Sequence, residues 1–225
     1  MSEAWLILET SNRGGRVGLA VGGAVVRTVD LDPARRHNRD LAPALAGMLE
    51  AEGIAAKSLH GVMVGVGPGS FTGLRVGVMS AKALAYATGC RLVAVPTFAA
   101  IAEQCPPEIA AVEVIADGLQ GMVFAQRFRR DSGGWQSASE LAIEPVATWA
   151  ARLPAGAWVT GPGVDVHDAA IPSAANRVAD RVLRVGSVFR VGLKLPPLNR
   201  DEMLRLEPLY LRPSSAEEKA VREGK

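Results

Sequence analysis

The fold of this 225-residue chain is decided by a loop that reads Gly65-Val66-Gly67-Pro68-Gly69-Ser70-Phe71-Thr72-Gly73. The loop follows a short apolar run that begins after His60, and it precedes a helical pattern that continues to Tyr86. Glycine occurs where the backbone takes a positive φ or approaches another segment closely, and proline restricts a loop further. The stretch therefore predicts a strand, a shaped glycine loop and a helix N-terminus, in that order.

Two interpretations of the glycine loop stay open. In the first, N–H groups at the helix N-terminus cradle a phosphate, and the candidate residues are Gly67, Gly69, Ser70, Thr72 and Gly73. In the second, the loop is only a tight connection, and Thr72 caps the helix. The spacing fits neither a P-loop nor a dinucleotide-binding motif. A serine hydrolase is not indicated either, because Pro68 stands where a nucleophile elbow needs glycine.

The helix after the loop has three faces when its residues are placed at about 100° intervals. One face is apolar and consists of Leu74, Val78, Ala81 and Ala85. A second face carries small, mostly apolar residues. The third carries Arg75, Met79, Lys82 and Tyr86. Because the helix has so little polar surface, we expect it to be buried on more than one side, either by a second layer of the same domain or by a partner subunit.

The composition narrows the class of protein. With 48% hydrophobic and 21% charged residues, the chain can bury a sizeable core. A net charge of +2 gives no electrostatic basis for direct binding to nucleic acid or to a membrane. No apolar run approaches the length of about 18 residues that a membrane span needs, and no signal peptide is visible. Since Cys90 and Cys105 are the only cysteines, we expect a soluble, cytoplasmic protein without disulfide bonds.

The order of the patterns predicts an α/β fold made from a duplicated unit. Three strands joined by glycine turns open the chain, and a helix beginning near residues 38–40 follows them. After the break at Pro106-Pro107, residues 111–117 and a second glycine turn repeat the opening. The expected limits are 1–105 for the first half, 106–213 for a reduced second half, and 214–225 for a disordered tail.

Glu9 and Asp117 end corresponding strands of the two halves. They could face each other across a cleft, where a duplicated fold of this kind holds a metal–nucleotide complex. Each could equally be a turn residue at a strand end, which is the interpretation that we favour. The spacing of the three histidines is not that of metal ligands, and neither His60 nor His167 has a visible carboxylate partner. Taken alone, the sequence predicts no catalytic site.

Several motifs resemble the TsaB family, which is also called YeaZ. The longest is the glycine loop with the helix that follows it, residues 67–77 and 81–85. Residues 6–11, His37 ahead of Leu41-Ala42-Pro43, and residues 208–213 fit the same family. The resemblance is dense through about residue 105. It implies an ASKHA-type fold, the architecture of actin, sugar kinases and Hsp70, built from two RNase H-like halves.

The resemblance also implies a function. TsaB is the non-catalytic dimerisation subunit of the complex that forms N6-threonylcarbamoyladenosine at position 37 of ANN-decoding tRNAs. Such a scaffold pairs with TsaD, helps to recruit the ATPase TsaE, reaches tRNA only indirectly, and forms a homodimer when alone. It binds no cofactor strongly, and ATP is used by the partner complex. The two pairing helices would be residues 38–52 and 72–88, with candidate contacts Leu41, Leu45, Met48, Leu74, Arg75, Val78, Met79, Lys82 and Tyr86.

Two departures from related patterns bear on catalysis. TsaD holds a metal with two histidines, and Thr97 and Ile101 stand at the corresponding positions here. Neither side chain can replace an imidazole at a metal. The segment 117–124 lacks the Arg and Glu that the family often has there, so no polar function is assigned to it. The alternative function is a small ASKHA-fold, nucleotide-binding phosphotransferase with Glu9 or Asp117 near Mg²⁺. No nucleophile–base arrangement supports a glycoprotease.

Overall fold

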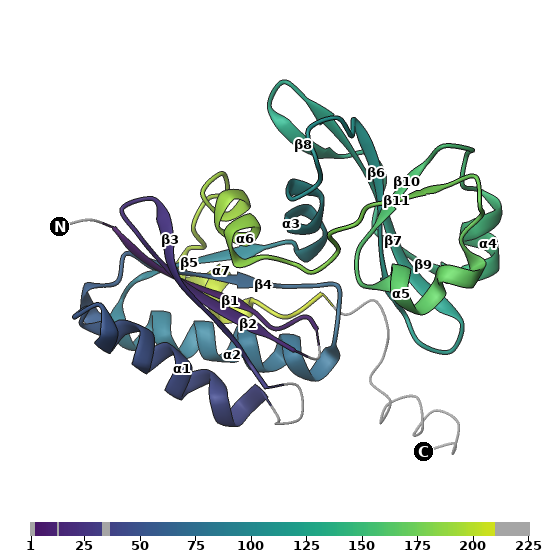
Figure 1. Ribbon diagram of the computed structural model, residues 1–225. Coiled ribbons are helices and arrows are strands. Elements are labelled where there is room, and N and C mark those ends of the chain that lie inside the picture. Colours follow the sequence, from purple (N-terminus) through teal and green to yellow (C-terminus); the bar gives the residue numbers. More distant parts are fainter. Residues whose placement is uncertain (1–2, 13, 33–36, 210–225) are drawn as a thin grey trace, which may run out of the picture.

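The computed structural model describes residues 3–12, 14–32 and 37–209, which form two sheets with helices packed on them (Figure 1). The strands of the first sheet are β1 (Ala4–Glu9), β2 (Arg16–Val21), β3 (Ala24–Asp30), β4 (Gly61–Gly65) and β5 (Arg91–Val95). Their spatial order is β3-β2-β1-β4-β5. Strands β1 to β3 are antiparallel, which confirms the predicted opening of the chain, and β4 and β5 continue the sheet in parallel.

The second sheet repeats the central part of this arrangement. Its strands are β6 (Ala111–Asp117), β7 (Met122–Asp131), β8 (Gly134–Ser137), β9 (Ala142–Pro145), β10 (Trp158–Thr160) and β11 (Asn176–Arg177). The order is β11-β10-β6-β7-β8, with β9 also paired to β7. As β1 does in the first sheet, β6 has an antiparallel neighbour on one side and a parallel neighbour on the other. This duplication confirms the expected α/β, ASKHA-type fold.

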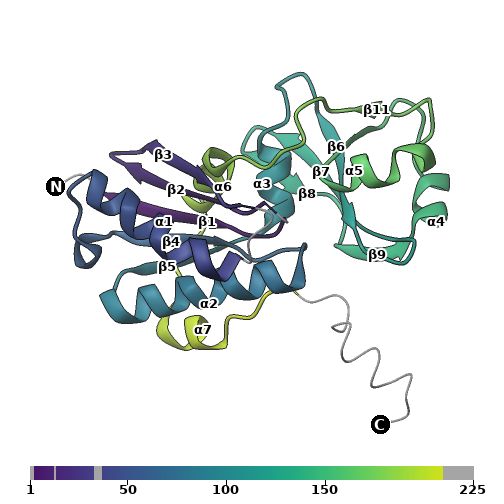
Figure 2. The ribbon, with the colours of Figure 1, turned by 60° about the horizontal axis from the view of Figure 1, so that its bottom comes forward.

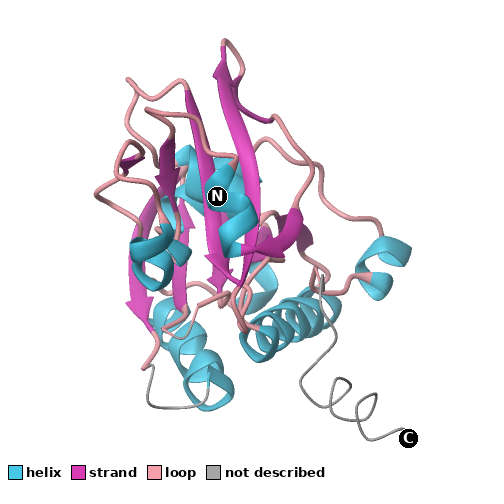
Figure 3. Ribbon diagram, turned by 90° about the vertical axis from the view of Figure 1, so that its right-hand side faces the viewer, coloured by secondary structure: helices cyan, strands magenta, loops and turns pink. Residues whose placement is uncertain are grey.

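Helices cover both faces of the first sheet. On one face lie α1 (His37–Ala51) and α2 (Phe71–Thr88), and on the other lies α6 (Val185–Gly192) (Figure 1). The remaining helices are α3 (Thr97–Glu103), α4 (Val146–Ala151), α5 (Gly163–His167) and α7 (Arg200–Arg205), with 3-10 turns at Ala56–Ser58 and Asp168–Ala170. Figure 3 looks from the side of the second half, with its strands standing above the helices of the first half. No helix within the described residues is both long and apolar enough to cross a membrane.

The chain returns to the first half near its end. Helix α6 packs on β1, β4 and β5, and Leu198, just before α7, hydrogen-bonds to Leu92 of β5. The limits expected from the sequence place α6 and α7 in the second half, 106–213. In the structure, α6 and the residues just before α7 contact the first sheet instead. The segment after residue 160 has only short elements without a clear period, so the sequence does not indicate this return. The expected tail, 214–225, lies outside the described residues.

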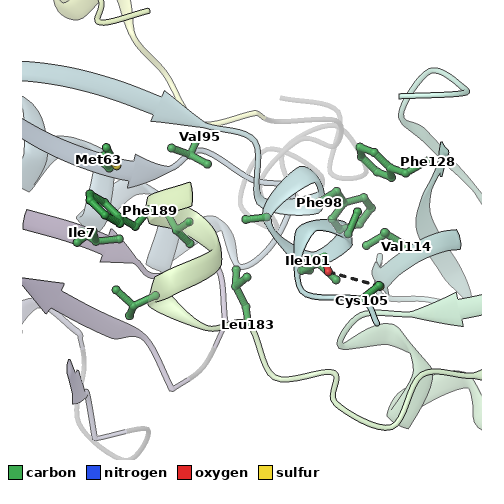
Figure 4. Packing of buried hydrophobic residues seen from close by; sticks show 14 of the residues in the cluster. Ile7, Met63, Val95, Phe98, Ile101, Cys105, Val114, Phe128, Leu183 and Phe189 are labelled. Carbon is green, nitrogen blue, oxygen red and sulfur yellow. Dashed lines mark hydrogen bonds between the residues drawn. The ribbon is translucent and has the colours of Figure 1, made fainter. Parts of the chain in front are cut away.

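One apolar core joins the two halves. It contains Ile7 and Met63 from the first sheet, Phe98 from α3 and Val114 from the second sheet (Figure 4). Phe189 of α6 packs into the same cluster. Full burial of a large apolar side chain is worth about 1.5–3 kcal/mol relative to exposure. Because α3 and α6 contribute to one continuous core, the halves are held together by the same interactions that fold each of them.

A second core cluster lies between the first sheet and helices α1 and α2. It includes Leu6, Leu8, Leu41, Met48, Val62, Val64 and Val78. Successive residues of β1 point to opposite faces of the sheet, and they alternate between this cluster and the cluster that joins the halves. That alternation is what a strand covered on both faces requires.

Glu9, the last residue of β1, carries a buried carboxyl group. Its Oε1 accepts the N–H of Ser11 at 2.7 Å, and among the described residues its Oε2 has no hydrogen-bond partner. Burial raises the pKa of Glu9, although the hydrogen bonds from Ser11 lower it in part. Glu113 is equally buried, but its carboxyl group has cationic partners: it forms ion pairs with Arg127 and Arg152 at 3.4 and 2.7 Å.

The buried carboxyl group of Glu9 predicts a pH-dependent stability. The folded protein keeps the Glu9 proton at pH values where the unfolded chain, with the ordinary pKa of 4.5, has lost it. The free energy of unfolding therefore falls as the pH rises from the ordinary pKa through the raised one. We expect Glu9→Gln to abolish this fall and to be more stable at neutral pH, by about 1.4 kcal/mol per unit of pKa elevation.

Urea unfolding at about pH 5 and at about pH 8 measures this effect. Glu50→Gln is the matched control, since Glu50 is an exposed carboxylate on α1. An equal loss of stability with pH in wild type and Glu9→Gln would show that Glu9 is not the responsible group.

Candidate functional site

The glycine loop between β4 and α2 uses its backbone groups for internal contacts. The N–H of Gly67 donates to Oγ1 of Thr97 at 3.1 Å, and the N–H of Ser70 donates to the carbonyl oxygen of Ser11 at 2.6 Å. Gly69 lies so close to Ser11 that an added Cβ would overlap the Ser11 carbonyl oxygen. The loop is therefore fixed between the end of β1 and the start of α3.

Ser70 caps α2. Its Oγ accepts the N–H of Gly73 at 3.3 Å, and its carbonyl oxygen accepts the N–H of Leu74 at 2.9 Å. The expectation that Thr72 caps the helix is wrong, because the contact of Ser70 with Ser11 closes the turn earlier and the helix begins at Phe71. Three N–H groups that could bind a phosphate, those of residues 67, 70 and 73, are thus already engaged. This geometry favours the tight-connection interpretation, and phosphate binding at the loop stays a prediction.

Four of the expected contact residues belong to the protein's own core. These are Leu41 and Met48 of α1, and Leu74 and Val78 of α2. All four are buried against the first sheet or the glycine loop, so they are not available to a partner. The sequence pattern correctly groups Leu74 with Val78 on one face, but a helical wheel does not tell which face points inward. Because Val78 is buried, a charged substitution there would disturb the fold and would not report on partner binding.

Gly77 allows α2 to lie close to the first sheet. A Cβ at this position would overlap Oγ1 of Thr10, just after β1. The close approach that the small residues of this helix predict is therefore made to the protein's own sheet. Since α2 is covered on this side by its own domain, only its opposite side can meet a partner.

The outer side of α2 carries an exposed stripe that consists of Arg75, Met79 and Tyr86, which we call the α2 stripe. Met79 is 56% exposed and Tyr86 is 68% exposed, and Arg75 is exposed as well. Helices α1 and α2 lie side by side on the outer face of the first sheet (Figure 2). The outer side of α1 adds small residues, including Pro43 and Gly47, whereas Leu45 is partly buried.

Lys82 has a role that its position in the sequence does not reveal. Its Nζ donates to the carbonyl oxygens of Leu204 at 2.8 Å and Leu206 at 3.1 Å, at the end of α7. The expected contact of Lys82 with a partner is therefore replaced by a contact within the chain. No sequence signal marks this pair, because the two helices are far apart in the chain.

Glu9 and Asp117 serve local structure at the two strand ends. Glu9 accepts the N–H of Ser11, and Asp117 accepts the N–H of Leu119 at 2.9 Å. Both bonds are those of a carboxylate in a turn, which is the interpretation that we favoured. The backbone of Leu119 has a positive φ of 62° in this hairpin, a conformation that is uncommon for leucine.

His60 and His167, for which the sequence shows no carboxylate partner, each have a carboxylate neighbour in the structure. Nε2 of His167 lies 3.2 Å from Oδ1 of Asp117, and Nε2 of His60 lies 3.3 Å from Oε1 of Glu3. The expectation that they have no such partner is wrong. Each pair joins residues that are distant in the chain and meet only when α5 packs on β6 or when β4 pairs with β1.

Thr97 and Ile101 are both part of the fold. The hydroxyl of Thr97 accepts a hydrogen bond from the glycine loop, and Ile101 is buried in the core that joins the halves. Over the described part of the chain, no group of three or more His, Cys, Asp or Glu residues is placed to hold a metal ion.

Comparison with known proteins identifies relatives of this chain. A family model described as TsaD, tRNA N6-adenosine threonylcarbamoyltransferase, matches residues 31–193. The chain is 28% identical over 160 residues to the tRNA threonylcarbamoyladenosine biosynthesis protein TsaB of Escherichia coli, which is 69% of either chain. It is 26% identical over 150 residues to the TsaB protein of Haemophilus influenzae, covering 64% of this chain and 63% of the relative.

A solved structure has the same fold. It is an uncharacterized protein from Pseudomonas aeruginosa with similarity to peptidase YEAZ. The superposition has a TM-score of 0.79 at 22% identity and covers 93% of this chain and 100% of the other. The family model and the TsaB relatives agree with the resemblance of the glycine loop. The chain therefore belongs to the family that the TsaD model describes and, within it, to the TsaB/YeaZ group.

Proposed function

We propose that this protein is the non-catalytic scaffold subunit of the complex that forms N6-threonylcarbamoyladenosine in ANN-decoding tRNAs. The names of the TsaB relatives, which are threonylcarbamoyladenosine biosynthesis proteins, support this assignment. In the proposal, the chain pairs with a TsaD-type catalytic subunit and helps to recruit a TsaE-type ATPase. It acts in the cytoplasm, and it reaches tRNA only through its partners.

The observation that carries the proposal is the α2 stripe. Exposed apolar surface costs about 25 cal/mol per Å², and this free energy is recovered when a partner covers it. Methionine, tyrosine and arginine are enriched at the centres of protein interfaces. With Met79 and Tyr86 more than half exposed, α2 presents a surface suited to packing against an apolar helix face.

The non-catalytic part of the proposal rests on Thr97 and Ile101. The resemblance places them where TsaD holds its metal, and here one supports the glycine loop while the other fills the core. Both residues thus have structural roles that a metal site would disturb. This supports the view that catalysis and the use of ATP belong to the partner complex.

The alternative, a nucleotide-binding phosphotransferase, has less support from the geometry. The N–H groups of Gly67, Ser70 and Gly73 hold the loop together and do not point to an open phosphate site. Glu9, which would lie near Mg²⁺, is buried, and burial disfavours its charged form and raises its pKa.

Charged substitutions in the α2 stripe test the interface. We expect Met79→Glu and Tyr86→Glu each to weaken binding to the TsaD-type partner by about 10-fold or more, because each places a charge in an apolar contact. The melting temperature should not change, since both side chains are exposed. Titration calorimetry measures the affinity. Val166→Glu, at an equally exposed site on α5, should bind as wild type, and unchanged affinity in both α2 variants would exclude this interface.

The same surface predicts the oligomeric state. We expect the chain alone to form a homodimer through the α2 stripe, because a self-complementary contact hides the apolar surface from water. On mixing with the TsaD-type partner, the dimer should exchange into a one-to-one complex. Size-exclusion chromatography with light scattering measures both states. A monomer that ignores the partner would contradict the scaffold function.

Modified tRNA provides the test of the function itself. Depletion of this protein in its own cells should lower the threonylcarbamoyladenosine content of tRNA, measured by mass spectrometry of the nucleosides. Wild-type protein should restore the content, and a variant carrying Met79→Glu and Tyr86→Glu should not. Unchanged modification after depletion would exclude the proposal.

A further inference from the structure

Lys82 lies on α2 between Met79 and Tyr86 of the α2 stripe, but its ammonium group binds a neighbouring helix. It donates to the carbonyl oxygens of Leu204 and Leu206, at 2.8 and 3.1 Å. The last carbonyl groups of a helix have no partner within the helix, and a cation is favourable beside them. Lys82 therefore caps the C-terminal end of α7.

Helix α7 is held at both ends by specific contacts. It has only six residues, so it would not be stable in isolation. At its N-terminal end, Asn199 and Glu202 form a capping box, in which each side chain accepts a hydrogen bond from the other residue's N–H. Lys82 supplies the cap at the other end. The sequence of α7 alone does not determine its position, and α2 contributes to it directly.

The segment that carries α7 is also tied to the first sheet. The N–H of Leu198 donates to Leu92 of the edge strand β5 at 2.8 Å. The N–H of Leu209 donates to Val66 at the start of the glycine loop, also at 2.8 Å. Between these anchors, Met203 is partly buried against the core beneath α2. Residues 198–209 thus lie in a defined place beside α2 (Figure 2).

One large apolar side chain of α7 remains in contact with water. Leu204 is 53% exposed, and its own carbonyl oxygen is one of the two that bind Lys82. Met79 and Lys82 are three residues apart on α2, and Lys82 and Tyr86 are four apart, so all three share one side of the helix. The carbonyl oxygen of Leu204 therefore meets α2 at Lys82, between the positions of Met79 and Tyr86 along the helix. Figure 2 shows α1, α2 and α7 in a row, with α2 in the middle.

We propose that α7 is a third contact element for the partner, and that Lys82 is a positioning residue that holds Leu204 beside Met79 and Tyr86. The inference rests on the proposed function, since the occupant is the apolar helix face of the same TsaD-type subunit. In this proposal Lys82 acts on the interface through α7, to which two of its three donors are bound. The partner surface would then combine helices from the beginning and the end of the chain.

The first test removes the apolar side chain. Leu204→Gln keeps a residue that favours helix and adds no charge beside Lys82. We expect it to weaken binding of the full-length chain to the TsaD-type partner by about 5- to 10-fold, with an unchanged melting temperature. Leu193→Gln is the matched control, because Leu193 is also 53% exposed but follows α6 on the other face of the first sheet. This control should bind as wild type.

The second test separates positioning from simple stability. Lys82→Met should weaken binding about as much as Leu204→Gln, whereas Lys82→Arg should restore it, since a guanidinium group can still donate to both carbonyl oxygens. The double variant Lys82→Met with Leu204→Gln should be no weaker than Leu204→Gln alone, because Lys82 acts through Leu204. A mere loss of stability would lower the melting temperature and add to the effect of Leu204→Gln.

Three results would overturn the inference. They are wild-type affinity in Leu204→Gln, additive losses in the double variant, and no rescue by Lys82→Arg. If Met79→Glu weakens binding while Leu204→Gln does not, only the role of α7 is wrong. If wild-type protein does not bind the partner at all, the proposed function fails, and the inference fails with it.

Discussion

The structure depends on the close contact between three glycines and the end of β1. A Cβ at Gly65, Gly69 or Gly77 would overlap an oxygen atom within residues 9–11. The glycine loop and α2 are thereby pressed against the first strand, and the loop's donors bind the protein itself. A glycine-rich turn before a helix often indicates a phosphate site. Here the same residues account for a tight junction inside the fold.

This junction determines which side of α2 faces outward. Because Gly77 and the apolar face of the helix are committed to the sheet, the α2 stripe is left in contact with water. The interface that we propose is therefore a consequence of the packing below it. Lys82 ties the end of the chain to the same helix through the carbonyl oxygens of Leu204 and Leu206. The interface that we propose includes the exposed side chain of Leu204.

The second half is joined to the first through a shared core and not through a flexible linker alone. Helix α3 carries Phe98 and Ile101 into that core, and α6 returns to the first sheet after the second half is complete. Residues at the start of α3 are thus needed for packing and for support of the glycine loop. A chain built in this way can present a fixed surface to a partner, which is what a scaffold requires.

The sequence by itself determined the three opening strands, the strand–loop–helix unit, the duplicated second half and the grouping of residues on each face of α2. These features follow from glycine turns and from side-chain periods, which act between near neighbours. Only the tertiary structure decided that Leu74 and Val78 face inward, that Ser70 caps α2, and that Lys82 binds α7. Lys82 and Leu204 are 122 positions apart. Contacts of this kind depend on how whole elements pack, and no local pattern in the sequence records them.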